Sequence, residues 1–130
     1  MTIKVMAAGV IAGTVFAAGV AVGQQQASTS RREPQFENSE VRVWKSIILP
    51  NQPLALHRHE HGRALIALTT GNLDVVDPNG KTIDTYKWEA GKAYWLDMDK
   101  PGTQHGDVNR GKTPMEVIVV ELKNDKPITK

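Results

Sequence analysis

Apolar and polar residues alternate with the two-residue period of β-strands along most of the chain after residue 40. Turn-forming residues separate the short runs, as in Asp77-Pro78-Asn79-Gly80. Eight strands are predicted, over Val41–Leu49, Leu54–His59, Ala64–Thr69, Leu73–Val76, Thr82–Trp88, Ala93–Leu96, Thr103–Val108 and Met115–Leu122. No amphipathic helix is predicted beyond the N-terminal stretch, so the pattern favours an all-β sandwich or barrel.

The N-terminal stretch has a different composition from the rest. Lys4 is its only charged residue. The segment from Val5 to Val22 is almost wholly apolar, and the stretch ends with the small residues Ala21-Val22-Gly23. These features predict a secretory signal over residues 1–23, with cleavage after Gly23 or Ala27, and hence a periplasmic or secreted protein. The alternative is an uncleaved anchor helix, because 18 apolar residues are just long enough to span a bilayer.

The remaining chain divides into three parts by composition. Residues 24–34 are polar without an apolar period and are predicted to be a flexible leader, residues 35–123 the folded barrel, and residues 124–130 a flexible tail. Without Lys4 the chain has 15 Lys and Arg against 14 Asp and Glu. This balance argues against nucleic acid as a partner. Because the chain has no cysteine, a metal would have to be held by His, Asp or Glu.

Three of the four histidines lie close together at His57, His59 and His61. On an extended strand, residues two apart point to the same face, so all three side chains would share it. The fourth, His105, lies on a separate predicted strand. Neutral imidazole is the commonest protein ligand for transition metals. A His-x-His pair and a distant His therefore indicate a metal site, provided that the fold brings them together.

These residues and the strand pattern resemble the cupins, small β-barrels with a double-stranded β-helix (jelly-roll) fold. The first cupin motif is His-x-His, three or four residues, a Glu, six residues and a Gly; His57, His59 and Gly71 match it. The second motif is matched by Gly91, by the turn and histidine of Pro101-Gly102-Thr103-Gln104-His105, and by Asn109. The resemblance covers about Val41 to Leu122 and implies a small single-domain cupin of the conserved-barrel type.

One position departs from the motif. The Glu that usually supplies the fourth metal ligand would fall at Arg63 or Ala64. Either His61 turns inward as a fourth ligand, or the centre has three histidines and open positions, as in cupins that use iron and oxygen, such as thiol dioxygenases. The competing interpretation is a degenerate cupin whose histidines merely line a polar cavity. In this interpretation, and also if the metal centre has only three histidines, His61 would lie at the surface or behind the ligands.

Other residues have two interpretations each. Arg63 either points into the barrel, where its planar guanidinium suits an anionic substrate, or forms an external salt bridge with Glu60. Tyr94 or Trp95 should face inward, and Tyr94 or His61 is the best available group for proton transfer. Trp44, Trp88 and Trp95 are expected to be core or interface anchors. Asn109 is expected to fix the turn after His105.

The resulting hypothesis is an exported metal-dependent cupin that acts on a small anionic molecule, with dioxygenase-like chemistry favoured over isomerase or lyase chemistry. The metal would be a divalent Fe, Zn, Mn or Ni ion at His57, His59 and His105. The alternative is a periplasmic metal- or ligand-binding or sensing module without turnover. A homodimer is expected because jelly-roll sheet edges invite pairing, and no membrane span is expected once the signal is removed.

Overall fold

The structure, a computed structural model, describes residues 29–126 as an all-β domain. Its strands are β1 (Arg31–Glu37), β2 (Val41–Ile48), β3 (Leu54–His57), β4 (Arg63–Ala67), β5 (Gly71–Val76), β6 (Thr82–Trp88), β7 (Ala93–Leu96), β8 (His105–Val108) and β9 (Met115–Leu122). The all-β prediction is confirmed, and each of the eight predicted strands is present with ends that differ by a few residues at most. Within these residues, no helix is long and apolar enough to cross a membrane.

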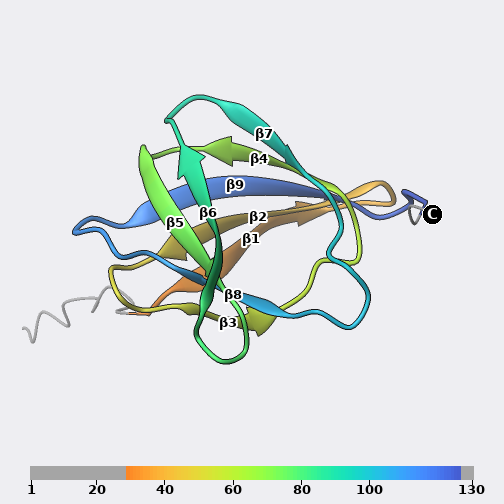
Figure 1. The fold of residues 1–130 in the computed structure, drawn as a ribbon. Helices are drawn as coiled ribbons and strands as arrows, with labels where there is room; N and C mark the ends of the chain where they lie inside the picture. The colour runs from red at the N-terminus through yellow and green to blue at the C-terminus, as the bar shows by residue number, and fades with distance from the viewer. Residues whose placement is uncertain (1–28, 127–130) are drawn as a thin grey trace, which may run out of the picture.

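The strands form two antiparallel sheets that face each other (Figure 1). One sheet has the order β1-β2-β9-β4-β7, and the other has the order β3-β8-β5-β6. Strands distant in sequence are therefore neighbours in space, and β9 lies between β2 and β4. In the second sheet the register pairs His57 of β3 with His105 of β8. This pairing joins the two histidine-containing segments.

The inward side chains of both sheets form one core between the layers. On β4, burial alternates, with Arg63, Leu65 and Ala67 buried and the residues between them partly exposed. The core cluster comprises Trp44, Ile48, Leu54, Leu65, Ala67, Leu73, Trp88, Met115, Val117 and Val119. Trp44 and Trp88 are thus core residues as expected, whereas Trp95 is 55% exposed. Buried polar side chains, among them His59, Arg63, His105 and Asp107, line a cavity together with apolar side chains of this core.

The folded part extends beyond both boundaries that composition suggested. β1 begins at Arg31 rather than Gln35 and pairs along β2, with a bulge between Pro34 and Phe36. Its sequence has no apolar alternation because it is an exposed edge strand, where proline and charged residues are common. At the other end, Asn124 donates a hydrogen bond to the Ser39 carbonyl. The predicted signal over residues 1–23 lies outside the described residues.

Candidate metal centre

Three histidines meet at one end of the barrel interior. His57 ends β3, His105 begins β8, and His59 lies in the segment between β3 and β4. One nitrogen from each ring can be chosen so that all three lie within 4.8 Å of one another. The ring centroids of His57 and His105 are 4.5 Å apart, and those of His57 and His59 are 4.9 Å apart. The sequence-based grouping of these three residues is reproduced by the fold.

The backbone of His59 is not held by a strand, since β3 ends at His57. Asp99, in the segment between β7 and β8, supplies its partners instead. The His59 N–H donates to Asp99 Oδ2 at 2.7 Å, and the Asp99 N–H donates to the His59 carbonyl at 2.8 Å. This pair of hydrogen bonds positions His59 beside the two strand-borne histidines.

Each of the three rings has an acceptor beside Nδ1. The Ala55 carbonyl lies 2.7 Å from Nδ1 of His57, Glu121 Oε2 lies 3.1 Å from that of His59, and Asp99 Oδ2 lies 3.2 Å from that of His105. A carbonyl and ionised carboxylates can only accept, so the proton of each neutral ring is assigned to Nδ1. The three Nε2 atoms then present lone pairs. Acceptors behind the rings fix metal-binding histidines in this way.

Burial keeps two of these rings in the neutral form that a metal requires. Burial lowers the pKa of His57 to about 4, against smaller opposing effects of the Ala55 carbonyl and Asp107. Burial also lowers the pKa of His59, against the hydrogen bond to Glu121. The Nε2 atom of His57 is buried and lacks a hydrogen-bond partner. Asp107 Oδ2 lies 3.4 Å from it, within ion-pair range, but the geometry does not make a hydrogen bond. A buried lone pair without a donor fits a metal ligand.

The carboxylates behind the rings are ionised. Burial would raise the pKa of Asp99, but hydrogen bonds from His105 and from the His59 backbone outweigh it and bring the pKa down to about 2. The pKa of Glu121 is likewise lowered, because its contact with His59 outweighs the effect of burial. Sequence analysis did not identify Asp99 or Glu121. Nothing in local spacing could have done so, because they lie 40 and 62 residues from His59.

Arg63 points into the barrel. It is 3% exposed, and its Nη1 donates to the Asp97 carbonyl at 3.0 Å. Glu60, the alternative partner, is instead exposed and lies 3.7 Å from Nε of Arg58. Burial lowers the pKa of Arg63, but a guanidinium stays charged at neutral pH. The inward orientation was one of the two expected, and it places a fixed positive charge beside the histidines.

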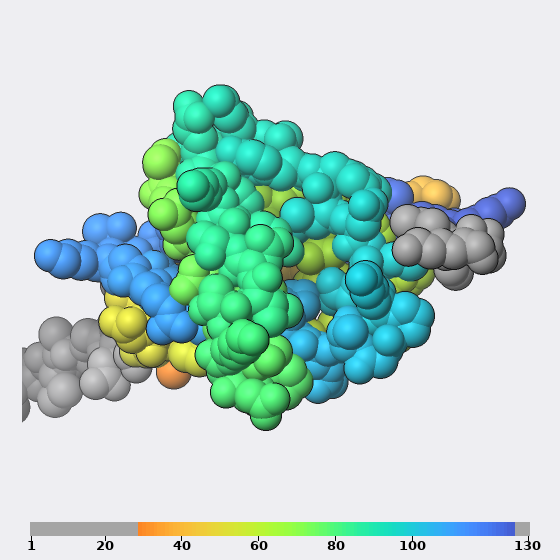
Figure 2. All heavy atoms as spheres, viewed as in Figure 1, coloured from red at the N-terminus to blue at the C-terminus, as the bar shows by residue number. Residues whose placement is uncertain are grey.

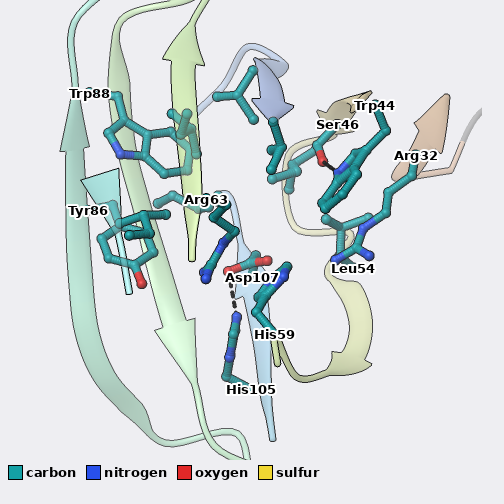
Figure 3. A pocket seen from close by; sticks show the side chains of 16 residues that line it. Arg32, Trp44, Ser46, Leu54, His59, Arg63, Tyr86, Trp88, His105 and Asp107 are labelled. Carbon is teal, nitrogen blue, oxygen red and sulfur yellow. Dashed lines mark hydrogen bonds and ion pairs between the residues drawn. The ribbon is translucent and has the colours of Figure 1, made fainter. Parts of the chain in front are cut away.

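Arg63 and two of the histidines, His59 and His105, line a small cavity of about 30 Å³. In Figure 3, Arg63, Asp107, His59 and His105 point toward one another across it. The volume is enough for roughly two water-sized species. In the space-filling view, a hollow opens between β6 and the segment that joins β7 to β8 (Figure 2). The interior therefore has room for an ion and a very small ligand.

His61 lies outside the histidine group. Its Nδ1 is 2.6 Å from Asp125 Oδ1, and Oδ2 of the same carboxylate accepts the Gly62 N–H at 2.7 Å. The chain has left the strand before His61, so the alternation that would have aligned it with His57 no longer applies. The structure thus brings together three of the four histidines, and Asp125 belongs to the segment that composition assigned to the tail.

Tyr94 also lies outside the cavity. Its hydroxyl accepts the Glu89 N–H at 2.9 Å, and its ring packs against the core. Tyr86 of β6 lines the cavity instead. Its ring is stacked on that of Trp88, with the ring centroids 5.4 Å apart, and burial raises the pKa of its hydroxyl. The expectation that Tyr94 or Trp95 faces inward is therefore met by Tyr94, but the tyrosine that lines the cavity is Tyr86. Alternation along Thr82–Trp88 would have placed Tyr86 and Trp88 on one face.

Asn109 and Asp107 complete the surroundings of β8. The Asn109 side chain donates to the Ile48 and Thr113 carbonyls and accepts the Gly111 N–H, so it fixes the turn after His105 as expected. Asp107 is 8% exposed and lines the cavity. Sequence analysis missed Asp107, although its spacing of two from His105 placed both on the same strand face.

Comparison of the sequence with models of protein families and with curated proteins found no match. Solved structures do match. A cupin domain from Bordetella pertussis superposes with a TM-score of 0.64 at 23% identity, over 77% of this chain and 99% of that one. An uncharacterized double-stranded β-helix protein from Klebsiella pneumoniae superposes with a TM-score of 0.54 at 24% identity, over 76% of this chain and 81% of that one. An RmlC-like cupin from Methanocaldococcus jannaschii superposes with a TM-score of 0.55 at 15% identity, over 77% of this chain and 85% of that one. The chain therefore has the cupin double-stranded β-helix fold, with a three-histidine cluster that fits a metal-binding cupin.

Proposed function

We propose that the protein binds one divalent transition metal ion through Nε2 of His57, His59 and His105. The observation that carries this proposal is the clustering of the three histidines, with one ring nitrogen from each within 4.8 Å of the others. Acceptors at the three Nδ1 atoms leave the Nε2 lone pairs for the ion. Imidazole nitrogens suit Fe, Zn and Ni ions, and nearby carboxylates extend the range to Mn. Nothing in the donor set selects one of them.

The ion supplies the reactive chemistry when bound: it polarises a carbonyl or enolate oxygen or, as iron, activates dioxygen. The chain supplies charge and restricted space. Arg63 holds a buried positive charge on the cavity wall, and the guanidinium of Arg32 lies 4.9 Å from the ring of Trp44, which also lines the cavity. These groups support a small anionic substrate, held by hydrogen bonds from a guanidinium fork.

We favour a dioxygenase-like reaction of this anion, because three neutral ligands leave positions for both a substrate oxygen and dioxygen. The alternative is a metal- or ligand-binding module without turnover. The cavity of about 30 Å³ favours this alternative, because an organic substrate would need side chains to move before it could approach the ion. In either case, the composition of residues 1–23 supports export to the periplasm or medium.

Metal content tests the first part of this proposal. Protein purified with Fe, Zn, Mn and Ni supplied is measured by mass spectrometry, as wild type and as the double variant His57→Ala with His105→Ala. The proposal requires an equimolar metal in the wild type and almost none in the double variant. Absence of metal from the wild type would refute it.

Oxygen consumption then separates the two functions. The iron-loaded protein is incubated with thiols, diketones and aromatic acids, and dioxygen uptake is recorded with an electrode. Uptake with one substrate class, lost in the double variant, supports the dioxygenase. Stoichiometric metal without turnover of any candidate, together with binding of an anion, supports the binding module.

Assembly and export are tested separately. Two sheets with open edges at β1, β7, β3 and β6 support pairing of two copies through a strand edge. Light scattering should give twice the mass of the chain. Mass spectrometry of exported protein should show loss of residues 1–23; retention of these residues at the membrane would support the anchor instead.

A further inference from the structure

We propose that Asp107 is the fourth protein ligand of the metal centre and supplies the carboxylate that the cupin motif would place at Arg63 or Ala64. This inference rests on the proposed three-histidine site and extends it to a site with three histidines and one aspartate. Asp107 Oδ2 lies 3.4 Å from Nε2 of His57, and Asp107 Oδ1 lies 3.9 Å from Nε2 of His105. Both contacts are on the side of the rings where the metal would bind.

The separation between Asp107 and His57 is that of two ligand atoms that share one ion. With bonds of about 2.1 Å, neighbouring ligand atoms lie roughly 3.0 Å apart in octahedral and roughly 3.4 Å apart in tetrahedral geometry. The contact with His57 matches this range, and that with His105 is longer. Asp107 does not belong to the group whose atoms all lie within 4.8 Å of one another. Its carboxylate must therefore move as the ion binds, so that one oxygen comes closer to the histidine nitrogens.

The contact between Asp107 and His57 lacks a proton in the assigned tautomer. The Nδ1 proton of His57 is directed at the Ala55 carbonyl, so Nε2 and the carboxylate oxygen present lone pairs to each other. Two buried acceptors at this distance repel unless a cation lies between them. A divalent ion bound by both converts the repulsion into shared coordination.

No other carboxylate that contacts these rings in residues 29–126 occupies an equivalent position. Asp99 and Glu121 face Nδ1 of His105 and His59, on the opposite side of each ring from Nε2. Asp125 is paired with His61 and Gly62. Asp107 is held on the inward face of β8 because it is two residues from His105 and pairs with Leu54 in register.

The charges around the cavity give a reason for this placement. On β4, at the place of the motif's carboxylate, the chain has the buried cation Arg63. A dipositive ion close to a buried guanidinium is unfavourable in a low-dielectric interior. Asp107, which lines the same cavity from the other sheet, reduces that repulsion. Figure 3 shows Asp107 beside Arg63, with a dashed line from its carboxylate to His105. The proposed carboxylate ligand thus comes from β8 rather than from β4, where the cupin motif would place it.

The test compares Asp107→Asn, which keeps the shape and removes the charge, with Asp84→Asn, which removes an exposed carboxylate from β6. Zinc affinity is measured by competition with a chelator, and circular dichroism of the metal-free variants confirms the fold. We expect Asp107→Asn to weaken zinc binding about 100-fold or more, beyond the usual effect of a residue behind the ligands. Asp84→Asn should bind like the wild type.

Crystals of the zinc-loaded wild type supply the readout that a merely electrostatic role would not give. An Asp107 oxygen should lie about 2.0 to 2.2 Å from the anomalous zinc peak. A distance beyond about 3 Å, or unchanged zinc affinity in Asp107→Asn, would overturn the role of Asp107 and leave the three-histidine site intact. Failure of the wild type to bind zinc would instead overturn the metal centre itself, and this inference with it.

Discussion

Asp99 and His59 exchange two hydrogen bonds, from the His59 N–H to Asp99 Oδ2 at 2.7 Å and from the Asp99 N–H to the His59 carbonyl at 2.8 Å. The same carboxylate oxygen lies 3.2 Å from Nδ1 of His105. Asp99 therefore joins the segment after β3 to the first residue of β8. Two of the three histidines proposed as ligands, His59 and His105, therefore depend on the Asp99 side chain, which faces their Nδ1 side and not the proposed metal position.

Replacement of Asp99 by Ala should remove the contacts that position His59 and His105. We expect zinc affinity to fall about 10- to 100-fold, the usual effect of losing a partner behind a ligand. The free energy of unfolding should also fall by about 1 to 3 kcal/mol, because partly buried donors lose their acceptor. Chelator competition and urea denaturation measure the two effects, with Asp84→Asn as control. Zinc affinity equal to that of the wild type would show that Asp99 does not position the ligands.

His61 should be dispensable for the metal. Its Nδ1 is directed at Asp125, and it lies outside the histidine group. His61→Ala is expected to retain zinc affinity within about 2-fold, whereas His59→Ala should lose 100-fold or more, because only the latter is a direct ligand. Isothermal titration of both variants gives the comparison. Equal losses in the two variants would make His61 a ligand after all.

Arg63 should act on anions rather than on the fold. In Arg63→Met, a buried charge beside the proposed ion is removed. The affinity of the cobalt(II)-loaded protein for acetate, followed by visible absorption, should fall about 10-fold or more, because a charge-assisted hydrogen bond is lost. Cobalt affinity itself should not decrease, since a repulsive charge has gone. Unaltered acetate binding would remove Arg63 from the anion site.

Stability of the metal-free protein should depend on pH through His57. Its pKa is about 4 in the folded state, where burial disfavours the charged form, against 6.5 for the exposed side chain. Between these values the unfolded state binds more protons than the folded state, so the free energy of unfolding decreases as the pH falls from 6.5 to about 4. Urea denaturation at several pH values should show this decrease, and His57→Gln should reduce it. A decrease of the same size in His57→Gln would assign the effect to other groups.

The sequence predicted the fold because alternation and turn residues are local signals. Both persist in β2, β6 and β9, whose bounds match the predicted strands closely. It could not predict β1, since Arg31–Glu37 has no apolar face and is a strand only through its pairing with β2. At the site, cupin-like spacing found His57, His59 and His105. The sequence did not predict Asp99 and Glu121 as partners of the rings, because only the sheet topology brings them there.

The most direct test of the metal centre is long-range nitrogen NMR of the histidine rings during addition of zinc. We predict that His57, His59 and His105 of the metal-free protein carry their proton on Nδ1. An equimolar amount of zinc should shift the Nε2 resonances of all three and leave those of His61 in place. Coordination through Nδ1, or no change in these three rings at equimolar zinc, would contradict the account.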